Sequence, residues 1–282
     1  MILAQLCFAG MNVCTRLGAA QLFWAEIGAA RFLIGALLAL AFAAARGIPL
    51  RITDRPGAWR RSIFGTVAAI ATFYALSSSR IAIGDAATLS ATGPIFVALL
   101  SGPMLGERVG GWLGLAVALA FAGVVALVGP SFQLAAPVAL IATAGAFFYA
   151  LAMIWLRRIG PGESHEAIVL HFSLVGLAAM VALAIPFWQW PDARGGLFLL
   201  GAGLGGGGGQ LAMTRAYAIR RAAPVTALSN LGIVFTYLMA LPLFPGRPTA
   251  WQLAGSLLVI AATVLVASSP ESSPRRSIMF RP

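Results

Sequence analysis

One stretch of the chain occurs twice, and this repeat restricts the possible folds more than any other feature. Residues 89–125 and 228–264 align at a constant offset of 139 positions and share eleven identical residues of thirty-seven. Roughly three identities would arise by chance in so Ala-, Leu- and Gly-rich a composition, so we expect two copies of one structural unit. The identical pairs are Leu89/Leu228, Ser90/Ser229, Gly93/Gly232, Phe96/Phe235, Leu99/Leu238, Pro103/Pro242, Arg108/Arg247, Trp112/Trp251, Leu119/Leu258, Ala122/Ala261 and Val125/Val264.

Ten apolar stretches are long enough, or nearly so, to cross a bilayer, which takes about twenty helical residues. They are residues 1–17, 22–45, 62–79, 82–105 and 111–128, then 134–156, 167–188, 197–219, 222–244 and 251–267. Five helices in each copy require the two halves to cross the membrane in opposite directions. We therefore predict an all-α integral membrane protein of ten transmembrane helices in two inverted five-helix repeats. The repeats span residues 1–133 and 134–270, and residues 271–282 form a disordered cytoplasmic tail.

The composition agrees with a membrane protein. Hydrophobic residues make up 60% of the chain and charged residues only 10%, against about 25% charged in soluble domains. All nineteen basic residues are arginines, and most of them lie in the connections between apolar runs, which indicates membrane topology rather than nucleic-acid binding. Placing the arginine-rich connections in the cytoplasm puts both termini there. The longest of these connections is predicted to hold Arg46, Arg51, Arg55, Arg60 and Arg61.

Polar side chains recur on single faces of several predicted helices. Hydrogen bonding between helices is one explanation, worth on the order of 1 kcal/mol per bond. A shared aqueous cavity is the other, because Asn, Gln and Tyr are costly to bury in lipid. We predict a binding site with Tyr74, Asn230 and Tyr237 as its main contacts. The further candidates are Asn12, Gln210, Tyr217, Ser78, Thr88 and Thr92.

Few titratable groups lie inside the predicted spans. Glu26, Arg31 and His171 are candidates for proton or charge coupling. Each has an alternative explanation: Glu26 can be solvated near an interface, Arg31 can form a structural tie or bind a substrate carboxylate, and His171 can bond a backbone carbonyl. His165 and His171 stand without clustered carboxylates, so the sequence predicts no metal site.

Two glycine-containing segments are candidate hinges. In the pair Gly93-Pro94, the proline removes a helical hydrogen bond and should kink the fourth span. The second segment is a run of five glycines that either makes the eighth span bendable or lets a neighbouring helix approach closely. This run is Gly205, Gly206, Gly207, Gly208 and Gly209.

Residues 74–128 resemble the EamA-type module of the drug/metabolite transporter superfamily. The resemblance rests on Gly93-Pro94-Ile95-Phe96, on Leu105-Gly106-Glu107-Arg108 and on Ala122-Gly123-Val124-Val125. The second copy departs from this pattern, because Ile233 stands in the place of Pro94 and Gly246 in the place of Glu107. In its overall run of sequence, the chain is most similar to the bacterial YddG-type exporters of amino acids. These resemblances imply a ten-helix transporter of the bacterial inner membrane, without cofactor, whose central cavity is lined by the first, third, fourth, sixth, eighth and ninth helices.

The predicted function is export by alternating access, not an enzymatic reaction. The expected substrates are amino acids, with aromatic or apolar side chains preferred, or similar small metabolites, because polar but weakly charged cavities suit zwitterions. Export of lipophilic cations or drugs is the alternative, although the first span carries Asn12 and no acid. Sugar-phosphate carriers fit less well, because the chain has no lysine and few arginines inside its spans. The expected partners are the substrate and the lipid bilayer, with no nucleic acid; the oligomeric state stays open and includes a monomer.

Overall fold

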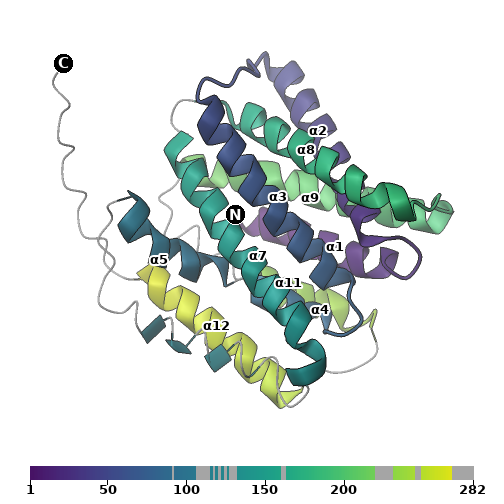
Figure 1. Ribbon diagram of the computed structural model, residues 1–282, viewed down its shortest axis with the longest axis vertical. Helices are drawn as coiled ribbons and strands as arrows, with labels where there is room; N and C mark the ends of the chain where they lie inside the picture. Colours follow the sequence, from purple (N-terminus) through teal and green to yellow (C-terminus); the bar gives the residue numbers. More distant parts are fainter. Residues whose placement is uncertain are drawn as a thin grey trace.

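The computed structural model describes residues 1–90, 92–105, 115–116, 118–119, 122–123, 126, 132–159, 163–219, 231–244 and 249–268. All regular elements within these ranges are helical (Figure 1). In the first half they are α1 (Ile2–Gly18), α2 (Trp24–Arg46), α3 (Arg55–Ser77), α4 (Ile83–Ser90) and α5 (Gly93–Leu105). In the second half they are α7 (Phe132–Ile159), α8 (His165–Ala184), the 3-10 turn η3 (Ile185–Phe187), α9 (Ala193–Ile219), α11 (Leu231–Ala240) and α12 (Ala250–Ser268).

Helix α3 begins earlier than the apolar pattern predicts. Asp54 accepts a hydrogen bond from the backbone amide of Gly57 at 2.9 Å, and Pro56 lies in the first turn. Both features favour the start of a helix, because they satisfy or remove amide donors that have no partner inside the helix. The helix therefore starts at Arg55 rather than at Ser62, where the apolar run begins.

The predicted fourth span is broken into two helices. Helix α4 ends at Ser90 and α5 begins at Gly93, so that Pro94 occupies the first turn of α5, where a proline is tolerated. At the break, both the amide and the hydroxyl of Thr92 donate to the carbonyl of Leu89, at 3.2 and 2.7 Å. The fourth predicted span is thus interrupted just before Gly93-Pro94, whereas the sequence predicted only a kink at this pair.

Three helix pairs, each joining the two halves of the chain, form the frame of the molecule. Helix α3 lies along α7, α2 along α8, and α1 along α9 (Figure 1). Glycines permit the close approach: a Cβ added to Gly176 of α8 would collide with the ring of Phe32 in α2. One added to Gly145 of α7 would lie 2.7 Å from the Cβ of Ala71 in α3. Membrane helices associate through such small-residue contacts, because lipid provides no hydrophobic drive.

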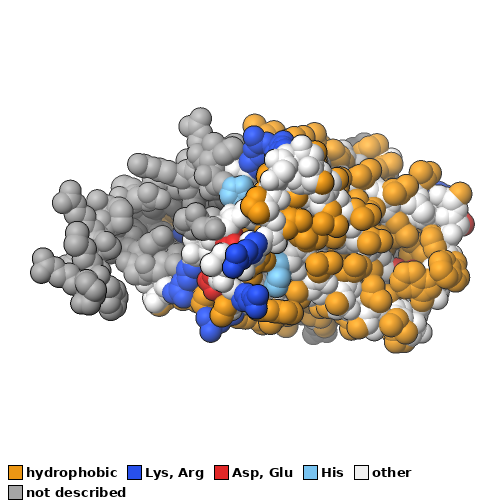
Figure 2. Space-filling view, turned by 90° about the horizontal axis from the view of Figure 1, so that it is seen from above, with side chains coloured by type: hydrophobic (Ala, Val, Ile, Leu, Met, Phe, Trp, Pro, Cys, Tyr) orange, Lys and Arg blue, Asp and Glu red, His pale blue; other side chains and the backbone are white. Residues whose placement is uncertain are grey.

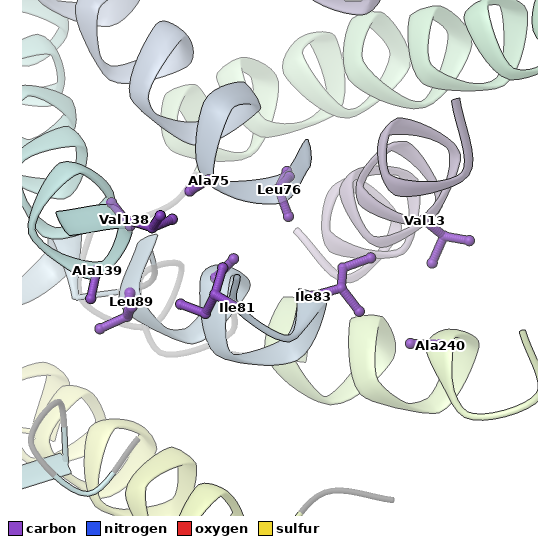
Figure 3. Close-up of a cluster of buried hydrophobic side chains, with 11 residues drawn as sticks. Val13, Ala75, Leu76, Ile81, Ile83, Leu89, Val138, Ala139 and Ala240 are labelled. Atoms are coloured by element: carbon purple, nitrogen blue, oxygen red, sulfur yellow. The ribbon is translucent and has the colours of Figure 1, made fainter. Parts of the chain in front are cut away.

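Two clusters of buried apolar side chains hold the helices together. In the first, α1, α3, α4, α7 and α11 converge, and Leu76, Leu89 and Val138 are fully buried (Figure 3). In the second, α1, α2, α3, α8 and α9 meet around larger rings, including Phe32 and Phe73. Among the described elements that share several contacts, helix α12 contacts α4 and α5.

The outer surface carries large apolar side chains in rows. Figure 2 shows apolar side chains over much of one face, with arginine side chains gathered in a band beside them. In water so extensive an apolar surface would be unfavourable, whereas lipid tails accommodate it. Two of the exposed rows are Leu33, Leu37 and Leu40 on α2, and Leu197, Leu200 and Leu204 on α9.

Length and composition identify three helices in the described ranges that can cross a membrane: Trp24–Arg46, Pro137–Ile159 and His165–Phe187. Ile2–Gly18, Leu231–Ala240 and Ala250–Leu265 are shorter apolar helices. Most of the predicted span 111–128, the start of 222–244 and the predicted tail 271–282 lie outside the described residues. The count of ten spans and their inverted arrangement therefore remain predictions.

Candidate functional site

A cavity of about 220 Å³ lies between the two halves of the chain. Six helices supply most of its wall, namely α1, α3, α4, α7, α9 and α11. They correspond to the first, third, fourth, sixth, eighth and ninth expected spans. Helices α2 and α8 each add one side chain, Arg31 and Phe172. The volume lies below the range of about 300–1,000 Å³ that is typical of sites for drug-sized ligands, so it suits a small metabolite.

Three residues of the predicted site lie on the cavity wall: Asn12, Gln210 and Arg31. The Asn12 side-chain amide donates to the hydroxyl of Thr236 at 3.2 Å. The side-chain amide oxygen of Gln210 accepts a hydrogen bond from the Arg31 guanidinium at 3.3 Å. Asn230 and the side chain of Tyr217 lie outside the described residues.

Much of the remaining wall is apolar or aromatic. It includes Phe8, Met11, Phe73, Met213 and Ile233. The cavity therefore combines an apolar body with a small number of polar groups, as most small-molecule sites do.

Arg61 is a cavity residue, and its predicted place in the connection before the third span is wrong. It lies in the second turn of α3, only 3% of its surface is exposed, and it lines the cavity. The capping residue Asp54 and the following Pro56 were the signal that could have placed it in a helix. Tyr149 of α7 and Phe172 of α8 also line the cavity and were not among the predicted contacts.

Tyr237 and Thr88 belong to a buried network outside the cavity wall. The Tyr237 hydroxyl donates to one carboxylate oxygen of Asp85 at 2.6 Å, and the side-chain amide of Gln252 donates to the other at 2.6 Å. The Ser256 hydroxyl lies 3.3 Å from that of Thr88 and donates to Tyr237 at 3.4 Å. These bonds join α4, α11 and α12, which is the interhelical role that the sequence left open as the alternative.

The other predicted contacts also lie away from the cavity wall. The Tyr74 ring meets the Trp24 ring edge-on, with centroids 6.1 Å apart. The backbone carbonyl of Ser78 accepts a hydrogen bond from the Arg16 guanidinium. The Thr92 hydroxyl bonds to the carbonyl three residues before it, at 2.7 Å.

Glu26 and His171 each have a structural partner. Glu26 is 3% exposed, so it is not solvated, and one carboxylate oxygen accepts from the backbone amide of Gln189 at 2.7 Å. The His171 ring nitrogen Nδ1 lies 2.8 Å from the Ser62 hydroxyl, and the ring packs edge-on against Trp59. Neither side chain lines the cavity. In the described part of the chain, no three His, Cys, Asp or Glu side chains are grouped to hold a metal ion.

The glycine run lies inside α9, which continues through it without a break. A Cβ added to Gly205 would lie 2.7 Å from the carbonyl oxygen of Cys7 in α1, and one added to Gly207 would lie 2.8 Å from the Cα of Gly35 in α2. An added Cβ at Gly206 would collide with the side chain of Arg31. The run therefore brings three helices together beside the cavity.

Comparison with known proteins identifies relatives across most of the chain. The EamA-like transporter family matches residues 1–129. The pseudopaline exporter CntI of Pseudomonas aeruginosa is 30% identical over 273 residues, which cover 93% of each chain. A riboflavin transporter of Vibrio cholerae is 23% identical over 283 residues, which cover 98% of this chain and 94% of that one.

Two further similarities concern a longer relative and the fold. Human solute carrier family 35 member G1 is 26% identical over 220 residues, which are 72% of this chain and 60% of the relative. The chain thus spans about 60% of the length of that relative. A solved crystal structure superimposes with a TM-score of 0.67 at 18% identity, covering 93% of this chain and 95% of the other. At that identity the likeness concerns the fold alone.

Proposed function

The chain belongs to the EamA-like transporter family, and from this premise we propose that it exports amino acids or similar small metabolites across the bacterial inner membrane. Substrates with an aromatic or apolar part are preferred. The carrier works by alternating access, without a cofactor, and it crosses the membrane several times with both termini in the cytoplasm. The export assigned to the Pseudomonas aeruginosa relative agrees with the proposed direction.

The cavity between the halves is the observation that carries this proposal. Its wall offers amide groups from Asn12 and Gln210 beside the aromatic rings of Phe8, Phe73 and Phe172. The oxygen of the Asn12 side-chain amide accepts no hydrogen bond from the described residues, so it is available to a substrate ammonium group. A small molecule with polar groups at one end and an apolar body fits these surfaces.

The helix contacts support two halves related by a repeat. Exchanging the halves replaces α1 by α7, α2 by α8, α3 by α9, and α4 with α5 by α11. The α3–α7 contact then becomes the α9–α1 contact, and α3–α8 becomes α9–α2; all four contacts are present. In the proposed cycle the halves rock against each other, with Gly93-Pro94 and Gly205–Gly209 as hinges.

Export of lipophilic cations is the weaker alternative. Arg31 and Arg61 both line the cavity, and their positive charges repel a cationic substrate. The same two charges favour substrates with a carboxylate.

Counterflow into proteoliposomes tests the proposal. Purified protein is reconstituted, and uptake of labelled phenylalanine, leucine and tetraphenylphosphonium is compared with that of protein-free liposomes. We expect amino-acid exchange well above the control and no exchange of the cation. Exchange of the cation alone would favour the alternative, and no exchange of any substrate in a broader metabolite panel would refute the proposed function.

The variant Asn12→Ala tests the cavity as the transport site. It removes a polar group from the wall, and we expect amino-acid exchange to fall by about tenfold, which corresponds to about 1.4 kcal/mol. Gln21→Ala is the matched control, because Gln21 is an exposed amide in the turn between α1 and α2. Equal rates for both variants would mean that Asn12 does not contact the substrate.

A further inference from the structure

Arg31 and Arg61 line the cavity, and each has buried hydrogen-bond donors that no described residue meets. Their exposed fractions are only 7% and 3%, so both guanidinium groups are removed from bulk water. Nε of Arg31 and both Nε and Nη1 of Arg61 are buried and have no partner among the described residues. Buried charged donors without partners are strongly unfavourable, so such groups are commonly completed by a ligand.

No carboxylate of the described residues lies within ion-pair distance of either guanidinium. Six of the eight acidic residues are described, and the other two are Glu107 and Glu271. Of the six, Asp85 is bonded to Tyr237 and Gln252, and Glu26 to the backbone amide of Gln189. The described residues around the cavity therefore offer the two cations no countercharge.

One aromatic ring brings the two cations together. The guanidinium carbon of Arg61 lies 4.2 Å from the centre of the Phe172 ring, and that of Arg31 lies 5.2 Å from the same point. The face of an aromatic ring attracts a cation but accepts no strong hydrogen bond. Two like charges thus share one small region of the cavity, and an anion that reaches both would relieve their repulsion.

We propose that the substrate is an organic dianion, with two carboxylate groups at one end and an apolar body. This inference rests on the proposed function, because it names the class of molecule that the transport cavity selects. Two guanidinium groups need two negative charges for neutrality, and each can bind a carboxylate through two parallel hydrogen bonds. The apolar body then lies against Met11, Met213 and Ile233 on the same cavity wall. A zwitterionic amino acid neutralises less of this charge, so it binds more weakly.

A series of ligands with one skeleton and different charges tests the proposal. The ligands are benzylsuccinate with two negative charges, 3-phenylpropanoate with one, phenylalanine as a zwitterion and 2-phenylethylammonium with one positive charge. Binding to the purified protein is measured by isothermal titration, and transport is measured by counterflow. We expect affinity to fall in that order, by about tenfold for each carboxylate lost. Equal affinity for benzylsuccinate and phenylalanine would overturn the proposal.

Arginine variants assign the selectivity to named side chains. We expect Arg61→Gln and Arg31→Gln each to weaken benzylsuccinate binding by about tenfold or more, with a smaller change for phenylalanine, and Arg61→Lys to retain part of the affinity. Arg60→Gln is the matched control, because Arg60 is exposed and lies over the ring of Trp155 at 4.6 Å. Benzylsuccinate binding that is unchanged in Arg61→Gln would contradict the assignment.

The stability of the unliganded protein separates a binding role from a structural one. Removing a buried charge that has no partner should leave the melting temperature of Arg61→Gln unchanged or raise it, whereas loss of a structural tie would lower it. The two proposals can also fail separately. Transport of phenylalanine without preference for the dianion would support the proposed export function and refute the proposal that the substrate is a dianion. Arg61-dependent binding of benzylsuccinate without transport of any ligand would support the dianion site and refute the transport function.

Discussion

At the scale of single residues, the polar side chains within the helices differ in whether other residues of the protein provide their hydrogen-bond partners. The carboxylate of Asp85 receives one donor on each oxygen, from Tyr237 and Gln252. Arg31 and Arg61 retain donors that no described residue meets. A buried group with complete bonding stabilises a particular helix arrangement, whereas a group with spare donors favours a ligand.

Tyr237→Phe should lower the stability of the protein. The substitution removes the only hydroxyl that donates to Oδ1 of Asp85 within the described residues, and an unsatisfied buried acceptor costs about 1–3 kcal/mol. Thermal unfolding in detergent measures the loss. Tyr74→Phe is the control, since the Tyr74 ring contacts Trp24 by its edge and keeps that contact without the hydroxyl. A normal melting temperature together with lost transport would indicate that Tyr237 contacts the substrate, as the sequence predicted.

At the level of elements, α9 shows how one helix serves packing and the cavity together. Its glycine run places the backbone of α9 against α1 and α2, while the next residue, Gln210, lies on the cavity wall and contacts Arg31. Glycine lowers helix stability by about 1 kcal/mol per residue relative to alanine. Close contacts with neighbouring helices offset this cost at some positions of the run, whereas other positions have no such contact.

Two neighbouring glycines of α9 should respond in opposite ways to alanine. In Gly207→Ala the new Cβ would lie 2.8 Å from the Cα of Gly35, so α2 and α9 must separate and the melting temperature should fall. In Gly208→Ala the new Cβ meets no atom within 4 Å. This change should raise stability by up to about 1 kcal/mol through helix propensity. If Gly208→Ala also slows transport while it stabilises the protein, α9 bends during the cycle.

The helices were predictable to different degrees. Apolar runs located α1, α2, α7, α8 and α9 to within a few residues, because burial in lipid requires such runs. Helical spacing also indicated that Asn12 and Gln210 lie on polar faces. It could not tell which neighbouring helix a face meets, and for that reason Tyr237 was assigned to substrate rather than to Asp85. Arg61 was missed because a charge beside an apolar run resembles a cytoplasmic flank until the capping by Asp54 is considered.

For the whole molecule, the central expectation is that the two halves cross the bilayer in opposite directions. The exchange of helix contacts between the halves supports a repeat, and the bias of arginine toward one set of connections supports the inversion. Both fit a transporter whose substrate cavity lies between the halves.

Cysteine labelling tests the inverted topology. Gly106 and Gly246 lie in the corresponding turns of the two copies, after the fourth and ninth predicted spans; both lie outside the described residues. In a background that lacks Cys7 and Cys14, we expect Gly106→Cys to react with an impermeant maleimide only from the cytoplasmic side, and Gly246→Cys only from the outside. Labelling of both from the same side would exclude inverted halves.

In the proposed cycle, the guanidinium groups of Arg31 and Arg61, for which the described residues offer no countercharge, also couple the protein to the electrical potential of the membrane. A charge that crosses the full membrane potential gains or loses about 2.3 kcal/mol per 100 mV, so any displacement of Arg31 and Arg61 along the field biases the empty carrier. With the cell interior negative, the voltage draws these cations toward the cytoplasm and favours the conformation open to that side. A dianion cancels both charges, so the loaded carrier turns outward without electrical work. The voltage would then speed the return of the empty carrier and so favour export.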